Sequence, residues 1–316
     1  MTVALTDSLS KAAELTKRSL FTRSDFGKWL NLGFVVFLAQ LAEGGYSFNI
    51  PNPNLSGKPS TLGKTSLADL LKEASAWLDS NMSLVLTIAV PVVLFVVALL
   101  VIFVWLSSYG KVILVESIVW DRHAVSEPWQ RLRPLASSLF KFRLALGSLA
   151  AVLGIGVVVT AFWLAYPDLA GGVFKERALL ATGIVAGYAL CLGLPLALIG
   201  WLLDDFVVPI MYLDNARVGA AWRTFRAEIW PGNAGALVLY YLTLIPLAFG
   251  TGVVIFIVTL VTCCVAGLPY VSSVVFLPIF VFRRAYSLHV LQGLGKRVFP
   301  EPAQPPAWGE SGRFGY

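Results

Sequence analysis

The stretch "SLVLTIAVPVVLFVVALLVIFVWL", residues 83–106, contains no charged side chain and is apolar on every side of a helix. A helix of about 20 predominantly apolar residues crosses the hydrocarbon core of a bilayer. We therefore predict a transmembrane helix over this stretch, and the rest of the chain is interpreted from it.

Other stretches have the same character, although the first is short. They lie at 29–42, 144–166 and 179–203, and a longer apolar block covers 235–282. That block is too long for one crossing, and the Gly and Pro of "CCVAGLPY", residues 263–270, predict a tight turn between two helices. The sequence thus predicts an all-α, polytopic membrane helix bundle of about six transmembrane helices over residues 26–298.

The composition agrees with a membrane protein and argues against a soluble one. Hydrophobic residues make up 57% of the chain and charged residues 13%, whereas soluble domains have about 45–50% and about 25%. The net charge is +6, but the basic residues lie at the ends of the predicted spans. We therefore expect contacts with anionic lipid headgroups and no nucleic-acid partner.

The basic residues also predict the orientation, because Lys and Arg collect in the cytoplasmic loops of membrane proteins. With six spans, both termini and alternate loops share one side of the membrane. That side holds every Lys and Arg except a small group in the two opposite loops, namely Lys58, Lys64, Lys72, Lys175 and Arg177. We expect a multi-pass protein of a bacterial inner (cytoplasmic) membrane with both termini in the cytoplasm.

Segments outside the spans have three different characters. Residues 1–25 form a cytoplasmic or interfacial segment in which Leu9, Ala12, Ala13 and Leu20 are the apolar positions. The outer loop, 47–82, contains an amphipathic pattern with a capping-box start at Ser66, which predicts a helix lying on the membrane surface. The tail, 299–316, is rich in Pro and Gly and is predicted to be disordered.

A short pattern occurs twice and predicts an internal repeat. Asp121, Trp129 and Arg133 recur with the same spacing as Asp214, Trp222 and Arg226, each time between an incoming and an outgoing span. Tandem two-helix units over 83–166 and 179–260 would explain this. Both units run in the same direction, unlike the inverted repeats of many secondary transporters.

The repeated turns, "EPWQRLRP" and "AAWRTFR", have two interpretations. Tryptophan and arginine at headgroup depth are ordinary anchors that set helix depth and tilt. Alternatively, the two turns jointly form a site for anionic lipid headgroups or a protein partner, with the candidate residues Trp129, Arg131, Arg133, Trp222, Arg223 and Arg226. In either case we expect Asp121 to pair with Arg133 and Asp214 with Arg226 as structural ion pairs.

Ionisable residues inside a membrane are functional candidates by default, and the predicted spans contain almost none. Asp204 and Asp205, at the end of the fourth span, are candidates for a cation or proton site. Neighbouring residues on a helix point about 100° apart, however, which favours ordinary boundary charges. The sequence contains no recognisable catalytic motif and no metal-ligand spacing, so we expect neither an enzyme nor a cofactor.

Small residues predict close packing between spans. Gly183 and Gly187 lie four residues apart in the fourth span, and Gly147 and Ala151 do so in the third. Such spacing allows helix backbones to approach one another, which favours tight packing within the bundle and leaves homodimerisation as the alternative.

The chain resembles a known group of membrane proteins in the segments "DFGKWLNLGFVVFLAQLAEGG" (25–45), "WQRLRP" (129–134), "AAWRTFR" (220–226) and "LPYVSSVVFLPIFVFRRAYSLHVL" (268–291). It is similar to an uncharacterised family of bacterial six-span membrane proteins over most of residues 22–298. A looser similarity is to the membrane domains of some glycerophosphodiester phosphodiesterases. The resemblance implies an all-helical inner-membrane bundle and brings no catalytic residues to this chain.

Two functions are consistent with these observations. The first is a non-catalytic accessory, scaffolding or partner-binding subunit of a membrane protein complex, which the scarcity of intramembrane charge and the basic cytoplasmic loops favour. The second is a small-solute or lipid transporter, which the tandem units, the prolines within spans and the Asp204–Asp205 pair favour.

Overall fold

The structure, a computed structural model, describes residues 2–21, 26–42, 77, 80–120, 126–170, 176–262 and 268–299, and these are helical apart from short turns. Asp121 lies outside these residues. The predicted amphipathic helix in the loop 47–82 and the tail 299–316 lie almost entirely outside them. The helices are α1 (Thr2–Phe21), α2 (Phe26–Gln40), α4 (Met82–Trp120), α5 (Ser126–Arg131), α6 (Arg133–Ala170), α7 (Glu176–Tyr188), η1 (Ala189–Gly193), α8 (Leu194–Leu202), η2 (Leu203–Val207), α9 (Val208–Leu213), α10 (Val218–Thr224), η3 (Phe225–Ile229), α11 (Ala234–Val261), α12 (Pro269–Val275) and α13 (Leu277–Gly293).

Among the described residues, 4 helices are long and apolar enough to cross a membrane. They are α4, α6, the continuous run from α7 to α9, and α11. The first three contain the predicted spans 83–106, 144–166 and 179–203, and α11 lies in the first part of the block 235–282. The chain is therefore an all-helical membrane protein.

The other two predicted spans correspond to shorter helices. The stretch 29–42 falls mainly in α2, of which Trp29–Gln40 is apolar. The second half of the block 235–282 falls in α12 and α13, which have 7 and 17 residues. The predicted break at 263–270 is present as the interruption between α11 and α12. Six crossings remain a prediction.

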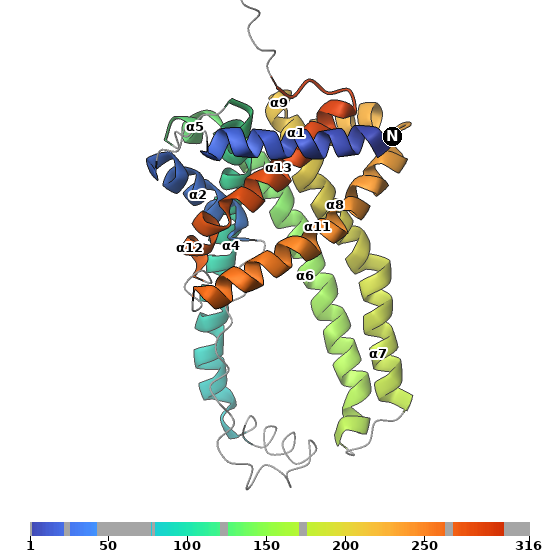
Figure 1. Cartoon of the computed structure of the whole chain (residues 1–316). Helices are drawn as coiled ribbons and strands as arrows, with labels where there is room; N and C mark the ends of the chain where they lie inside the picture. The colour runs from blue at the N-terminus through green and yellow to red at the C-terminus, as the bar shows by residue number, and fades with distance from the viewer. Residues whose placement is uncertain are drawn as a thin grey trace, which may run out of the picture.

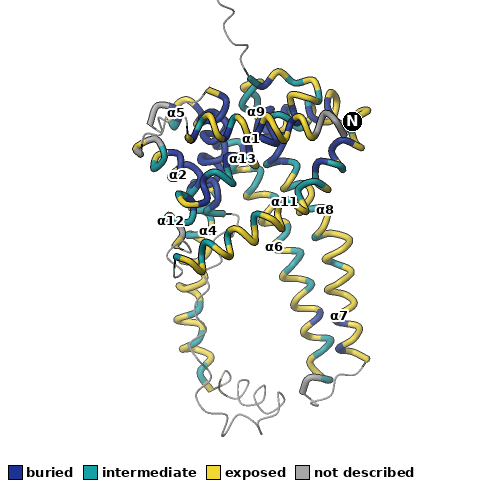
Figure 2. Tube along the Cα trace, in the orientation of Figure 1, coloured by how far each residue is buried: buried dark blue, intermediate teal, exposed yellow. Residues whose placement is uncertain are grey.

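The long helices extend well beyond the thickness of a bilayer. Helix α4 has 39 residues, or about 58 Å at the usual rise per residue, against a hydrocarbon core of about 30 Å. Its first part is exposed, whereas residues from Ser107 to Val119 are buried by other helices. Figure 2 shows that the buried residues gather at one end of the molecule, and the yellow, exposed parts of α4, α6 and α7 extend away from it.

We call this buried region the packed end. It consists of α2, the last part of α4, α5, the first part of α6, the segments η2–α9 and α10–η3, the first part of α11, and α13. Its largest fully buried side chains include Phe206, Phe225, Tyr240 and Tyr286. The apolar surfaces outside the packed end are suited to lipid, because lipid tails solvate them as well as neighbouring helices do.

Helix α1 lies across the packed end along α13 (Figure 1). It buries Ser8, Ala12, Thr16 and Leu20, which are four residues apart and form one stripe of the helix. Of the apolar positions named from the sequence, Ala12 and Leu20 belong to this stripe, whereas Leu9 and Ala13 are exposed. The smaller Ser and Thr side chains face the protein instead, and Thr16 donates a hydrogen bond to the Ala12 carbonyl within the helix.

Close contact between α2 and α4 depends on Gly110. A Cβ atom at this position would lie 2.8 Å from Leu38 Cβ and would also meet the backbone of α2. The Ser107 hydroxyl donates a 2.6 Å hydrogen bond to the Ala39 carbonyl across the same contact. Gly147, Gly183 and Gly187 have open space around the Cβ position, so the prediction that they pack tightly within the bundle was wrong.

Candidate functional site

The packed end buries several ionisable side chains. Lys111, Glu116, Asp205 and Arg284 are each less than a tenth exposed. These residues lie outside the predicted spans 83–106 and 179–203. Helix α4 continues to Trp120, so that Lys111 and Glu116 lie inside a helix and not in the loop expected after residue 106.

An ion pair joins α4 to the span α7–α9. Lys111 Nζ lies 2.5 Å from Asp204 Oδ2. Asp204 belongs to η2, a π-helical segment in which Val208 N–H donates to the Leu203 carbonyl. The same π pattern would direct the N–H of residue 209 to the Asp204 carbonyl, but residue 209 is proline and has none. Arg284 Nη1, from α13, donates a hydrogen bond to that carbonyl.

These charges face a cavity of about 560 Å³, which we call the charged cavity. It lies between α2, α4, α8–η2 and α13, and its charged lining residues are Lys111, Asp204, Asp205, Arg283 and Arg284. Two carboxylate oxygens, Asp204 Oδ1 and Asp205 Oδ2, are buried without a well-formed hydrogen bond from a described residue, and the hydroxyl of Tyr241 is a neighbouring donor for Asp205. Buried acceptors are normally satisfied, so these oxygens indicate a place for a donor.

One wall of the charged cavity belongs to the exposed surface of α8. Ala197, Gly200 and Trp201 of α8 line it, and Trp201 is 50% exposed. From Leu203 onward the chain is mostly buried, so the cavity lies where the exposed part of the span meets the packed end. The sequence analysis identified Asp204 and Asp205 as candidates but did not identify Lys111, Arg283 or Arg284 as their neighbours.

A second cavity, of about 590 Å³, lies beside α4, α5 and α6. We call it the aromatic cavity, and its lining residues are Trp105, Tyr109, Trp129, Gln130, Arg133 and Ser137. Trp129 stacks on Tyr109 with ring centroids 4.5 Å apart. This cavity brings together Trp129 and Arg133, two of the candidates from the repeated pattern.

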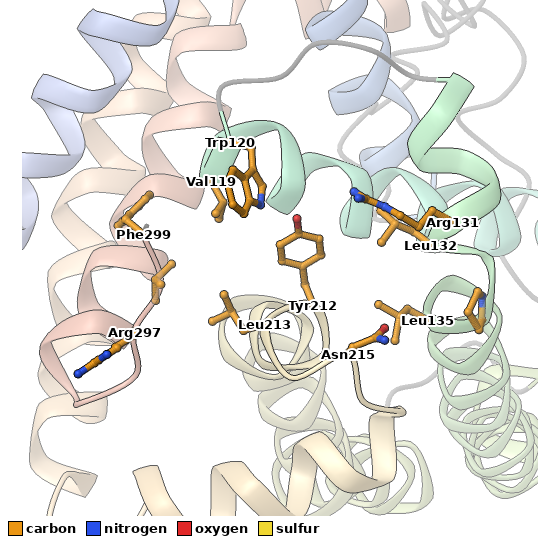
Figure 3. Close-up of a pocket in the computed structure, with 12 residues that line it drawn as sticks. Val119, Trp120, Arg131, Leu132, Leu135, Tyr212, Leu213, Asn215, Arg297 and Phe299 are labelled. Atoms are coloured by element: carbon orange, nitrogen blue, oxygen red, sulfur yellow. The ribbon is translucent and has the colours of Figure 1, made fainter. Parts of the chain in front are cut away.

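Arg131 faces a different cavity. Figure 3 shows this end cavity, of about 850 Å³, with Tyr212 near its centre and Arg131 and Arg297 on opposite sides. Arg131 forms an ion pair with the buried Glu116 of α4. Helices α4 and α9 end at this cavity, at Trp120 and Leu213, and helix C-termini are unfavourable for anions. Arg131 thus has Glu116 as its partner, and the two helix C-termini make this cavity unfavourable for an anion.

The second copy of the pattern forms no matching site. Trp222 packs against Phe142 and Phe225, and its indole N–H is buried without a hydrogen-bond partner among the described residues. Arg223 and Arg226 are exposed. The expected pair between Asp214 and Arg226 was wrong, because Asp214 Oδ2 lies 2.8 Å from Lys296 Nζ. The pair between Asp121 and Arg133 lies outside the described residues. The candidate residues of the two Trp/Arg turns thus lie on separate surfaces and do not form one joint site.

Comparison with known proteins gives a family and no activity. No curated protein and no solved structure matches the chain. A family model, described as Family of unknown function (DUF7544), matches residues 3–295. Because this match covers nearly the whole chain, the protein belongs to that family of unknown function.

Proposed function

We propose that this chain is a non-catalytic integral membrane protein that binds an amphiphile with a zwitterionic, hydrogen-bond-donating headgroup in the charged cavity. The observation that supports this most is that Asp204 and Asp205, whose buried oxygens Oδ1 and Oδ2 have no hydrogen-bond partner among the described residues, line a cavity large enough for a headgroup. An ammonium group with N–H donors would satisfy both oxygens with charge-assisted hydrogen bonds.

Besides the ammonium group, the proposed headgroup carries an anionic group. Lys111, Arg283 and Arg284 line the same cavity, so the basic residues in its lining outnumber the two aspartates. Arginine presents a fork of N–H donors that suits phosphate and carboxylate groups. A phosphate linked to an ammonium group, as in an aminophospholipid, matches both signs of charge.

The position of the cavity favours an amphiphile over a small solute. Its wall on α8 is lipid-facing and apolar, which suits an acyl chain, whereas its charged residues lie at the start of the packed end. Transporters for solutes typically bind them near the bilayer midplane between helices. Here the charges lie near the end of the exposed part of the span, at the depth of a headgroup.

This function fits a multi-pass protein whose packed end faces the cytoplasm. The described basic residues lie at the packed end and on α1, apart from Arg177 at the start of α7. The positive-inside tendency then places the packed end and both termini in the cytoplasm of a bacterial inner membrane, with six crossings. We propose that the protein acts as a lipid-binding accessory, scaffolding or partner-binding subunit of a membrane complex.

Native mass spectrometry of the purified full chain tests the proposal with two lipids of identical acyl chains, phosphatidylethanolamine and phosphatidylcholine. Both carry a phosphate and a positive charge, but only the ethanolamine headgroup has N–H donors. We expect about tenfold tighter binding of phosphatidylethanolamine, the size of one charge-assisted hydrogen bond. Asp205→Asn is expected to remove most of this preference.

Two control variants separate the site from general effects. Asp214→Asn removes an exposed carboxylate that pairs with Lys296 and should leave the lipid preference unchanged. Arg283→Gln should weaken both lipids about equally, because it removes a phosphate contact and no acceptor. Equal binding of the two lipids by the natural chain, or an unchanged preference in Asp205→Asn, would contradict the proposal.

A lipid or small-solute transporter is the second candidate. It is favoured by the π-helical segments η1 and η2, which lie in the same span as Asp204 and Asp205. π-helical turns occur frequently at functional sites. Movement of a fluorescent aminophospholipid between the leaflets of liposomes containing the protein tests this function, and no acceleration over protein-free liposomes would reject it.

A further inference from the structure

The aromatic cavity is built from side chains of two helices that pack together. Trp105 and Tyr109 lie one turn apart on α4, with ring centroids 5.0 Å apart. Trp129 of α5 closes the group by stacking on Tyr109 and meeting Trp105 edge to face at 6.0 Å. The three rings pack against one another, so the group forms a continuous wall and not an open cage around a cation.

The polar side chains of this cavity supply hydrogen-bond donors. Arg133 and Gln130 line it, and neither side chain forms a hydrogen bond or ion pair with any described residue. Among the described residues that line the cavity, none is acidic. A lining whose described residues supply a guanidinium, an amide and indole rings, and no carboxylate, is suited to an anion with several acceptor oxygens.

The position of the cavity identifies the source of that anion. Trp105 is 38% exposed and lies at the end of the lipid-facing part of α4, directly before the buried segment that begins at Ser107. Trp and Tyr side chains concentrate at this depth in membrane proteins, next to the lipid phosphates. The acyl chains of a bound lipid would lie along the exposed apolar residues of α4, whereas free phosphate would make no contact with those residues.

We infer that the aromatic cavity binds the phosphodiester of a bilayer phospholipid, with Arg133 as its main contact and the stacked Trp105, Tyr109 and Trp129 as its wall. This site is separate from the charged cavity. Tyr109 faces the aromatic cavity, whereas Lys111, two residues further along α4, faces the charged one. The described lining of the aromatic cavity contains no carboxylate to pair with an ammonium group, so it should accept phospholipids regardless of their terminal headgroup.

Lipid binding to the purified full chain tests this inference, with phosphatidylglycerol as the probe. A diacyl glycolipid with the same acyl chains and no phosphate is the control ligand. We expect Arg133→Gln to weaken phosphatidylglycerol binding about tenfold, Arg133→Lys to weaken it less, and the glycolipid to be unaffected. The matched control is Arg226→Gln, which alters the exposed arginine of the second copy and should change nothing.

The outcomes separate this site from its alternatives. Loss of binding in Arg133→Gln but not in Arg226→Gln supports the inference, and displacement by inorganic phosphate at matching concentration would overturn it in favour of a free anion. Unchanged phosphatidylglycerol binding in Arg133→Gln would also overturn it. The outcome is independent of the charged cavity, because the ethanolamine preference assigned to Asp205 should persist in Arg133→Gln.

Discussion

Lys111 Nζ and Asp204 Oδ2 lie 2.5 Å apart and join the buried part of α4 to the π-helical segment η2. The lysine side chain is 6% exposed and the aspartate side chain 25% exposed. The pair therefore lies where the surrounding dielectric is low and where a single unpaired charge would be costly. It also fixes Asp204, which lines the charged cavity and whose second carboxylate oxygen is buried without a hydrogen-bond partner among the described residues.

Lys111→Met should destabilise the fold, because it leaves Asp204 partly buried without its cation. Breaking a buried pair costs roughly 3 kcal/mol, and the partial exposure of Asp204 places the expected loss below that value. Unfolding in a denaturing detergent, followed by circular dichroism, measures it. The double variant Lys111→Met with Asp204→Leu should recover part of the stability, and no recovery would count against a specific pair.

Gly110→Ala should separate α2 from α4. The added Cβ would lie 2.8 Å from Leu38 Cβ and would press on the α2 backbone, which cannot move aside as a flexible side chain does. Overpacking of this kind costs about 1–3 kcal/mol. The control is Gly147→Ala, on α6, where the Cβ position is open. Equal stability of the two variants in the same unfolding assay would contradict the observed contact.

The docking of α1 on α13 should weaken in mild acid. Burial lowers the pKa of His289 below its ordinary value of 6.5, and Lys11 acts in the same direction, whereas Gln292 and Asp7 oppose them. The unfolded chain therefore takes up a proton near its ordinary pKa while the folded chain does not. Stability should decrease as the pH falls below about 6.5.

Hydrogen exchange of α1 between pH 7.5 and 5.5 measures this effect after correction for the intrinsic exchange rates. His289→Gln should remove the acid-sensitive part, because glutamine does not titrate. Identical pH profiles for the natural chain and His289→Gln would show that His289 has no part in it.

Accessibility labelling should place the packed end in the cytoplasm. In a chain whose natural cysteines are replaced, Asn215→Cys at the packed end and Arg177→Cys at the start of α7 lie on opposite sides of the membrane under our proposal. An impermeant thiol reagent added to intact cells should label position 177 and not position 215. The reverse pattern would reject the proposed orientation.

The fold was predictable where apolar length alone determines it. The stretch 83–106 and its counterparts at 144–166 and 179–203 all lie in long helices, because a helix satisfies its backbone hydrogen bonds within one segment and so suits a long apolar stretch in lipid. The ends of those helices were not predictable in the same way. Hydropathy decreases after Leu106, but the helix continues to Trp120, since packing against α2 and α13 stabilises it beyond the bilayer.

The site was only partly predictable, because its partners come from distant parts of the chain. Asp204 and Asp205 were recognisable as charges near a span end, but their contact with Lys111 and Arg284 depends on tertiary packing. The sequence did contain one usable signal, since Lys111 follows Gly110 in a strongly apolar context. The spacing that suggested a pair between Asp214 and Arg226 gave no information about Lys296, which is the actual partner.

Photocrosslinking tests the central claim most directly. A phosphatidylethanolamine with a diazirine close to its headgroup, bound to the full chain and activated by light, reports which residues surround the headgroup. Our account predicts adducts on residues 197–205 and near Phe280, with their loss in Asp205→Asn and their persistence in Asp214→Asn. Adducts confined to other exposed surfaces such as α11, or unchanged adducts in Asp205→Asn, would contradict it.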